Sequence, residues 1–170
     1  MLTNSRLAIL TLLAVITPLA GCDTAEKAPK NDTAAANAPL LPPFQQEIAS
    51  AKAEVTLPGV WKYGYRLVDK VDTTNGAYRA FEFHYTEAGN SRVPSRLLLV
   101  IRAYKKPAWE KIHATQDTVA RELVRHGDDV YVFSIIGTNP YPLNSPSSLR
   151  VDQMMLALTA EGSPFRMTFK

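Results

Sequence analysis

The sequence predicts an α+β domain in which two or three helices pack on an antiparallel sheet of about six strands. Several short segments alternate apolar with polar residues, which is the period of a strand with one buried face. Turn-forming residues separate these segments as in hairpins, and only a few segments have the spacing of a helix. The chain has 170 residues and one cysteine. A domain of this size without a disulfide must be held together by its apolar core.

The segment that opens the domain is predicted to be a short amphipathic helix. It follows Pro42 and Pro43, ends before Pro58, and carries apolar residues at helical spacing: Phe44, Ile48, Ala51 and Val55. Its two acidic residues outnumber its one lysine, so it has no basic face for anionic lipids. We therefore expect it to pack on the domain.

A hairpin with a three-residue loop is predicted next. Two rows of aromatic residues flank Asn75 and Gly76: Trp61, Tyr63 and Tyr65 before them, and Phe81, Phe83 and Tyr85 after them. A two-residue turn would place the rows on opposite faces, whereas a loop of residues 74–76 sets Leu67 beside Phe83 and Tyr65 beside Tyr85. The expected geometry is a type I turn with a glycine bulge, in which Gly76 has a positive φ.

A central strand and a helix follow the hairpin. Residues 96–104 contain five consecutive apolar residues, which predicts a strand that is buried on both faces. Pro107 begins a short helix that extends to about Ala114, with Trp109 and Ile112 facing inward.

Residues 119–124 fit either a strand or a continuation of that helix. We favour the strand, because residues 114–118 are poor helix formers. Residues 126–129 then form a turn into another strand at 130–136.

A helix and a strand complete the predicted domain. Ser145 and Pro146 begin the helix, Gly162 ends it, and an apolar stripe runs along it: Val151, Met154, Met155 and Leu158. Phe165, Met167 and Phe169 then alternate with polar residues, which predicts a last strand that pairs within the sheet.

The N-terminal segment has the parts of a secretory signal. Arg6 supplies positive charge, residues 7–16 form a short apolar core, and Pro18 interrupts the run before it reaches the roughly 20 residues of a membrane-spanning helix. The following Leu19-Ala20-Gly21-Cys22 resembles the lipobox of bacterial lipoproteins. That resemblance implies lipidation of Cys22, cleavage before it, and a mature chain anchored by two or three fatty chains.

Three regions follow from this assignment. Residues 1–21 are the signal peptide, residues 22–43 are the lipidated cysteine and a disordered tether rich in Ala and Pro, and residues 44–170 are a single α+β globular domain. A flexible tether of about 20 residues spans roughly 25 Å on average. Asp23 resembles the signal that retains enterobacterial lipoproteins in the inner membrane. We therefore favour the periplasmic face of the inner membrane over the outer membrane.

The search for catalytic or metal-binding patterns finds only weak candidates. The three histidines, His84, His113 and His126, are distant in sequence, although Glu110 and His113 are one helical turn apart. We interpret all three as surface residues. No Gly-x-Ser-x-Gly motif or phosphate-binding glycine loop is present, and the one cysteine is assigned to lipid. We assign no cofactor, and we lean against an enzyme.

Charge argues against nucleic acid as a partner. Loss of Arg6 with the signal peptide lowers the formal net charge from +3 to +2, which is nearly neutral. A nucleic-acid-binding domain carries a strong basic patch.

Two features are candidates for binding. One is the pair of aromatic rows, which would stack on sugar rings if they were exposed, but which we expect to form the core. The other is the proline-rich loop of residues 138–146, with Pro140, Tyr141 and Pro142. The leading hypothesis is a membrane-anchored, non-catalytic binding or assembly module of the bacterial cell envelope. Its partner would be an envelope protein, bound through this loop or an exposed sheet edge. The alternatives are a periplasmic metal-handling protein or hydrolase that uses surface histidines and carboxylates, and a peptidoglycan or carbohydrate binder.

Overall fold

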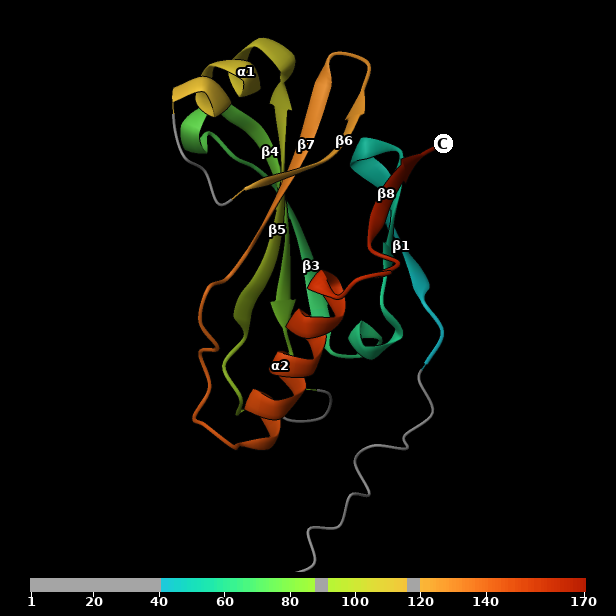
Figure 1. Cartoon of the computed structure of the whole chain (residues 1–170), viewed down its shortest axis with the longest axis vertical. Coiled ribbons are helices and arrows are strands. Elements are labelled where there is room, and N and C mark those ends of the chain that lie inside the picture. Colours follow the sequence, from blue (N-terminus) through green and yellow to red (C-terminus); the bar gives the residue numbers. More distant parts are fainter. Residues whose placement is uncertain (1–40, 88–91, 116–119) are drawn as a thin grey trace, which may run out of the picture. The chain divides into compact units, whose positions relative to one another are not determined.

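The computed structural model describes residues 41–87, 92–115 and 120–170. The predicted signal peptide, Cys22, Asp23 and nearly all of the predicted tether lie outside these described residues. The α+β class is confirmed, but the strands form two antiparallel sheets instead of one (Figure 1). The large sheet has five strands in the order β3 (Tyr65–Val71), β4 (Ala77–Tyr85), β5 (Arg96–Lys105), β7 (Asp129–Ile135) and β6 (Arg121–His126). The small sheet has the order β1 (Phe44–Ile48), β2 (Ala53–Leu57) and β8 (Arg166–Phe169).

The helices are α1 (Lys106–Thr115) and α2 (Pro146–Thr159), at opposite ends of the large sheet in Figure 1. Three short 3-10 helices lie in connections: η2 (Ala49–Ala51), η3 (Gly59–Trp61) and η4 (Thr74–Gly76). Two of the three predicted helices, those beginning at Pro107 and at Ser145 and Pro146, are confirmed at these places. The Ser145 hydroxyl caps α2 by accepting a hydrogen bond from the Ser148 N–H, and Pro146 occupies the first turn.

The helix predicted at residues 44–55 is wrong, because this segment is the β1–β2 hairpin. Lys52 turns the chain between the strands in a left-handed conformation (φ 50°, ψ 43°). Alternate residues of β2 are fully buried: Ala53, Val55 and Leu57. The period of two in this run, together with pairing to β8, outweighs the helical spacing of the more scattered apolar residues.

The register predicted for the β3–β4 hairpin is confirmed, but its turn type is wrong. Leu67 pairs with Phe83 and Tyr65 with Tyr85. Gly76 has the expected positive φ of 80°. Asn75 is also left-handed (φ 50°, ψ 36°), whereas a type I turn requires a negative φ there. Asparagine and glycine both tolerate this conformation, so consecutive left-handed residues close the loop.

The predicted strand from Trp61 to Leu67 is only partly correct. Trp61 belongs to η3, and β3 begins at Tyr65. Between them, Tyr63 is left-handed (φ 69°) and 75% exposed, so it does not continue the aromatic row.

The predicted central strand is confirmed as β5. It lies between β4 and β7, and its residues Leu98 to Ile101 are at most 5% exposed, so both faces are covered. The preferred strand at residues 119–124 is confirmed from Arg121 onward, where β6 excludes the helical alternative. The last predicted strand is also present, but it pairs with β2 in the small sheet rather than with the large sheet.

The large sheet is covered unequally on its two faces. One face packs in a single cluster with the small sheet and α2, whose buried members include Phe81, Phe83, Val55 and Met154. The opposite face has a smaller cluster beneath α1, in which Trp109 packs on Tyr104 with 5.5 Å between ring centroids. Both clusters are apolar, so burial of apolar surface stabilises each contact between layers.

A partly buried ion pair joins the loop after β3 to the central strand. The Asp72 carboxylate accepts hydrogen bonds from the Arg102 Nε (2.8 Å), the Thr74 N–H (2.9 Å) and the Thr74 hydroxyl (2.5 Å). Burial alone would raise the pKa of Asp72, but these donors favour the charged form and lower the pKa below its ordinary value of 3.8.

This ion pair predicts a specific pH dependence of stability. Because the pKa of Asp72 is lower in the folded state, its contribution is complete above the unfolded pKa and is lost as the pH falls toward the folded pKa. We expect Asp72→Asn to lower the free energy of unfolding by about 1–3 kcal/mol at pH 7. The difference between wild type and variant should shrink below about pH 4, as measured by urea unfolding across pH. A difference that stays constant down to pH 3 would contradict this account.

Candidate functional site

The aromatic rows form part of the core rather than an exposed binding surface. Four of the six aromatic side chains in these rows are at most 3% exposed: Trp61, Phe81, Phe83 and Tyr85. Tyr65 is half-buried, and its hydroxyl donates a hydrogen bond to Gln46 Oε1 at 2.7 Å. Burial raises the pKa of Tyr65 to about 12. Only Tyr63 is accessible for stacking on a sugar ring, so the rows do not provide the extended aromatic surface of a carbohydrate binder.

The three histidines lie in separate surroundings. His84 on β4 is 3.0 Å from Glu82 through its Nε2, and His113 on α1 lies 5.5 Å from the Trp109 ring. His126 at the end of β6 stacks on Phe169 with 4.0 Å between ring centroids. Among the described residues there is no group of three or more His, Cys, Asp and Glu side chains that could hold a metal ion.

The Glu82–His84 pair is the nearest approach to a catalytic arrangement. Burial would raise the pKa of Glu82, but Lys70 at 2.7 Å and His84 together lower it. A carboxylate that orients an imidazole is one part of a hydrolytic triad. A triad also needs a nucleophile that is hydrogen-bonded to the imidazole. Among the described residues, Glu82 is the only side chain within hydrogen-bond distance of the His84 ring. The pair therefore links neighbouring positions on the outer face of the sheet.

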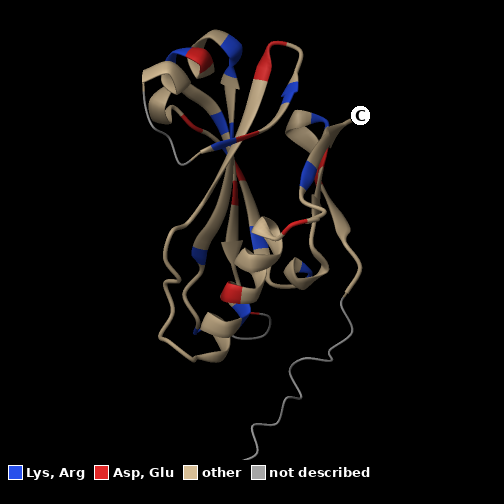
Figure 2. Cartoon of the chain, in the orientation of Figure 1, with Lys and Arg blue, Asp and Glu red and all other residues tan. Residues whose placement is uncertain are grey.

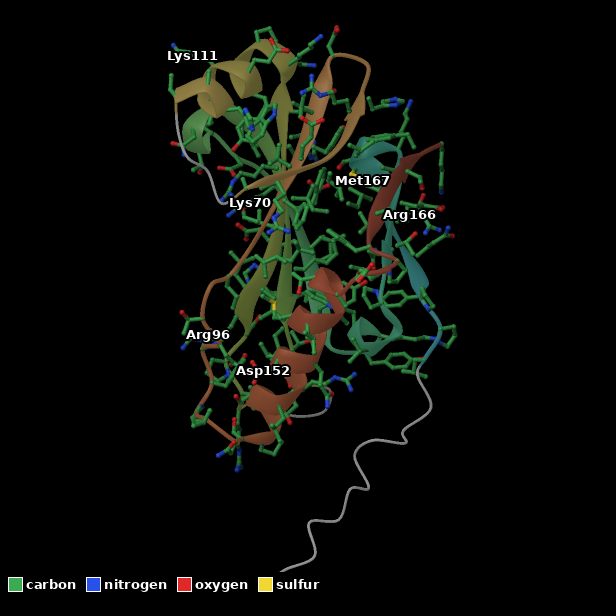
Figure 3. The ribbon with its side chains drawn as sticks, in the orientation of Figure 1. Lys70, Arg96, Lys111, Asp152, Arg166 and Met167 are labelled. Atoms are coloured by element: carbon green, nitrogen blue, oxygen red, sulfur yellow. The ribbon has the colours of Figure 1, made fainter. Side chains whose placement is uncertain are left out.

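The proline-rich loop is fixed to the domain at its centre. The Tyr141 hydroxyl donates a 2.7 Å hydrogen bond to the Pro94 carbonyl, and its ring packs against Tyr85 with 5.2 Å between centroids. Asn139 accepts a hydrogen bond from the Tyr141 N–H, and its amide donates to Asp152 Oδ1 on α2 at 2.8 Å. Figure 3 labels Asp152 on this helix. Pro140 and Pro142 remain exposed, so the loop presents a rigid rim beside α2.

An apolar groove runs between α2 and the β7 side of the large sheet. We call it the α2 groove; it has a volume of about 420 Å³ and is lined by Arg121, Phe133, Ile135, Ile136, Met155, Leu156 and Thr159. The two walls come from different parts of the sequence. Phe133 and Ile135 project from β7 on the core face of the sheet, and Met155 and Leu156 project from the side of α2. A volume in this range with a mostly apolar lining is typical of a binding site.

Three leucines on α2 and in the loop before it are exposed, and one of them lines the groove. Leu156 on its rim is 70% exposed, Leu149 is 53% exposed two helical turns earlier, and Leu143 in the proline-rich loop is 86% exposed. Single exposed apolar residues are common, but several of them beside an apolar groove indicate an interaction surface.

The groove has one charged lining residue. Arg121, at the start of β6, is exposed and forms no side-chain hydrogen bond or ion pair to the described part of the chain. The carboxylate of the neighbouring Glu122 accepts two hydrogen bonds from the Arg125 guanidinium, at 2.7 Å and 2.8 Å. None of the described residues that line the groove is acidic, so Arg121 is the only charged group among them.

A second hollow lies beside Tyr63, with a volume of about 330 Å³. Its charged residues already have partners within the domain. Arg150 donates to the Val60 carbonyl at 2.8 Å, Ser147 donates to Glu87 at 3.4 Å, and the Lys62 ammonium lies 5.3 Å from the Tyr63 ring centroid. This hollow is therefore the weaker of the two candidates.

Sequence reasoning located the proline-rich loop but not the groove beside it. The stripe Val151, Met154 and Leu158 correctly identified the buried side of α2. Leu149 and Leu156 lie outside that stripe at a spacing of seven residues, and this was the available signal for a second apolar face. Nothing in the sequence placed β7 opposite that face.

Comparisons with known proteins give no further guide to the site. No protein-family model, curated protein or solved structure matches the chain. Within the described residues, no helix is long and apolar enough to cross a membrane.

The two sides of α2 should respond differently to substitution. Leu156→Ser should change the free energy of unfolding by no more than about 0.5 kcal/mol, because the side chain is mostly exposed. Met154→Ala should cost about 2–5 kcal/mol, because that side chain is fully buried. Urea unfolding of the two variants checks this contrast. A large loss of stability in Leu156→Ser would mean that the leucine is structural rather than available for binding.

Proposed function

We propose that the chain is a lipid-anchored, non-catalytic binding module of a bacterial cell envelope, and that it holds an envelope protein at the α2 groove. The observation that carries this proposal is an apolar groove with exposed leucines on and beside its rim, in a domain whose other large apolar side chains are mostly buried. Exposed apolar surface of this kind is retained where it binds a partner.

The use of charged side chains supports binding over catalysis. Several ion pairs of the large sheet join neighbouring strands, as in Lys70–Glu82 and Lys105–Asp129, both at 2.7 Å. Figure 2 shows acidic and basic residues interspersed along these elements. Such pairs position strands and keep the surface soluble, and they do not converge on the groove.

The anchor rests on the lipobox-like sequence that ends at Cys22. Cys22 is the only cysteine of the chain, so its thiol has no disulfide partner and is available for lipid. Two or three fatty chains give essentially permanent membrane attachment. Asp23 favours the periplasmic face of the inner membrane, and the predicted tether allows the domain to search a few tens of ångströms around its anchor.

Loss of the anchor should release the domain. We expect Cys22→Ala to move the protein from the membrane fraction to the soluble fraction after cell breakage, because the lipid is the proposed attachment. The measurement is an immunoblot of fractions before and after a high-salt wash. Continued membrane association of the variant after that wash would argue against the lipid anchor.

The binding role is tested by photo-crosslinking in native membranes. A photoreactive residue at position 149 or 156 of the full-length chain should yield the same protein adduct, because these positions are seven residues apart on one side of α2. The control is position 111, since Lys111 is exposed on α1 and is labelled there in Figure 3. Absence of a reproducible adduct, or equal capture at position 111, would count against the proposed function.

A further inference from the structure

The chemistry of the α2 groove restricts what it can hold. Its walls are apolar except for Thr159, and its one charged lining residue is Arg121, for which the described residues supply no acidic partner. An occupant that fills the groove must therefore offer apolar groups to the walls. It also gains by placing a negative charge beside the guanidinium, which forms strong bidentate hydrogen bonds with a carboxylate.

The openness of the groove favours a protein segment over a small molecule. Sites for small molecules bury roughly 70–90% of the ligand surface. Here Leu156 is 70% exposed, and both Arg121 and Thr159 are exposed, so a small ligand would remain largely in water. A protein segment keeps its outer side covered by its own domain and uses only one face for binding.

The exposed leucines indicate the length of the contact. Leu149 and Leu156 are seven residues apart on α2, a separation of roughly 10 Å along the helix axis. An occupant that covers both leucines and reaches Arg121 must therefore extend along the helix. Short segments bind grooves in this way, with a few apolar anchor residues on one face.

We infer that the occupant of the α2 groove is a segment of a partner protein that carries large aliphatic side chains on one face and a carboxylate that pairs with Arg121. This inference rests on the proposed function and adds the chemistry of the partner. The aliphatic side chains pack on Phe133, Ile135 and Met155, and Leu156 closes over them. The carboxylate fixes the register of the segment, because a misplaced acidic group would lie against the apolar walls.

A charge-swap experiment tests the inference in the full-length chain in native membranes. The probe is the photoreactive residue at position 156, and mass spectrometry identifies the crosslinked peptide. We expect that peptide to contain an Asp or Glu close to aliphatic residues. Arg121→Glu should lower the adduct yield about tenfold or more, because like charges then face each other.

Matched controls separate binding from folding. Lys111→Glu makes the same change in charge on α1 and should leave the adduct yield unchanged. Arg121→Gln removes the charge without reversing it and should give an intermediate yield. Thermal unfolding confirms that each variant is folded; if Arg121→Glu is not, the Gln variant decides the result. Changing the identified carboxylate of the partner to Lys should restore the adduct with Arg121→Glu.

The outcomes distinguish the inference from the proposed function. A protein adduct that lacks an acidic residue, or equal yields for the Arg121 and Lys111 variants, would overturn the inference and leave the binding module intact. An adduct within α2 of a second copy would identify self-association and overturn the partner assignment. A lipid adduct, or no adduct, would overturn both proposals.

Discussion

The structure depends on the placement of one side chain, Trp61. Its indole is fully buried, and its Nε1–H donates a 2.8 Å hydrogen bond to the Met154 carbonyl in α2. The same ring makes edge contacts with Tyr65 of β3 and Phe83 of β4, at 5.8 Å and 6.3 Å between centroids. Trp61 lies in η3, shortly after the end of β2, so it connects the small sheet, the large sheet and α2. This contact helps to hold α2, and hence one wall of the α2 groove, in its position.

Much of the fold could be predicted, because many local signals agree with the tertiary structure. Proline and serine begin α2, and a run of apolar residues forms β5. The β1–β2 segment was mispredicted because Phe44, Ile48 and Val55 fit a helical period, while the partner that decides between helix and strand is β8 at the far end of the chain. The alternation of Ala53, Val55 and Leu57 is a local sign of β2, but its pairing with β8 cannot be read from the local sequence, which also explains why two sheets were taken for one.

The site was less predictable than the fold. The proline-rich loop is visible in the sequence as a cluster of turn residues around Tyr141, although the contacts of Tyr141 with Pro94 and Tyr85 are not. The groove could not be predicted in this way. Its walls are Met155 and Leu156 on a helix and Phe133 on a strand, and none of these residues stands out from the apolar pattern of its own segment. Arg121 is equally ordinary in sequence. Its significance comes from its place as the one charged residue among the described residues that line the groove, which only the three-dimensional arrangement reveals.

The small sheet has a consequence for how the chain matures. β2 lies between β1 and β8, and Lys170, just after β8, contacts Glu47 and Glu54 at 2.9 Å and 3.1 Å. The hairpin that forms first during synthesis therefore lacks its third strand until β8 has been made. Pairings between distant segments form slowly. The small sheet is therefore complete only once β8 pairs with β2, so its assembly waits on a contact between distant parts of the chain.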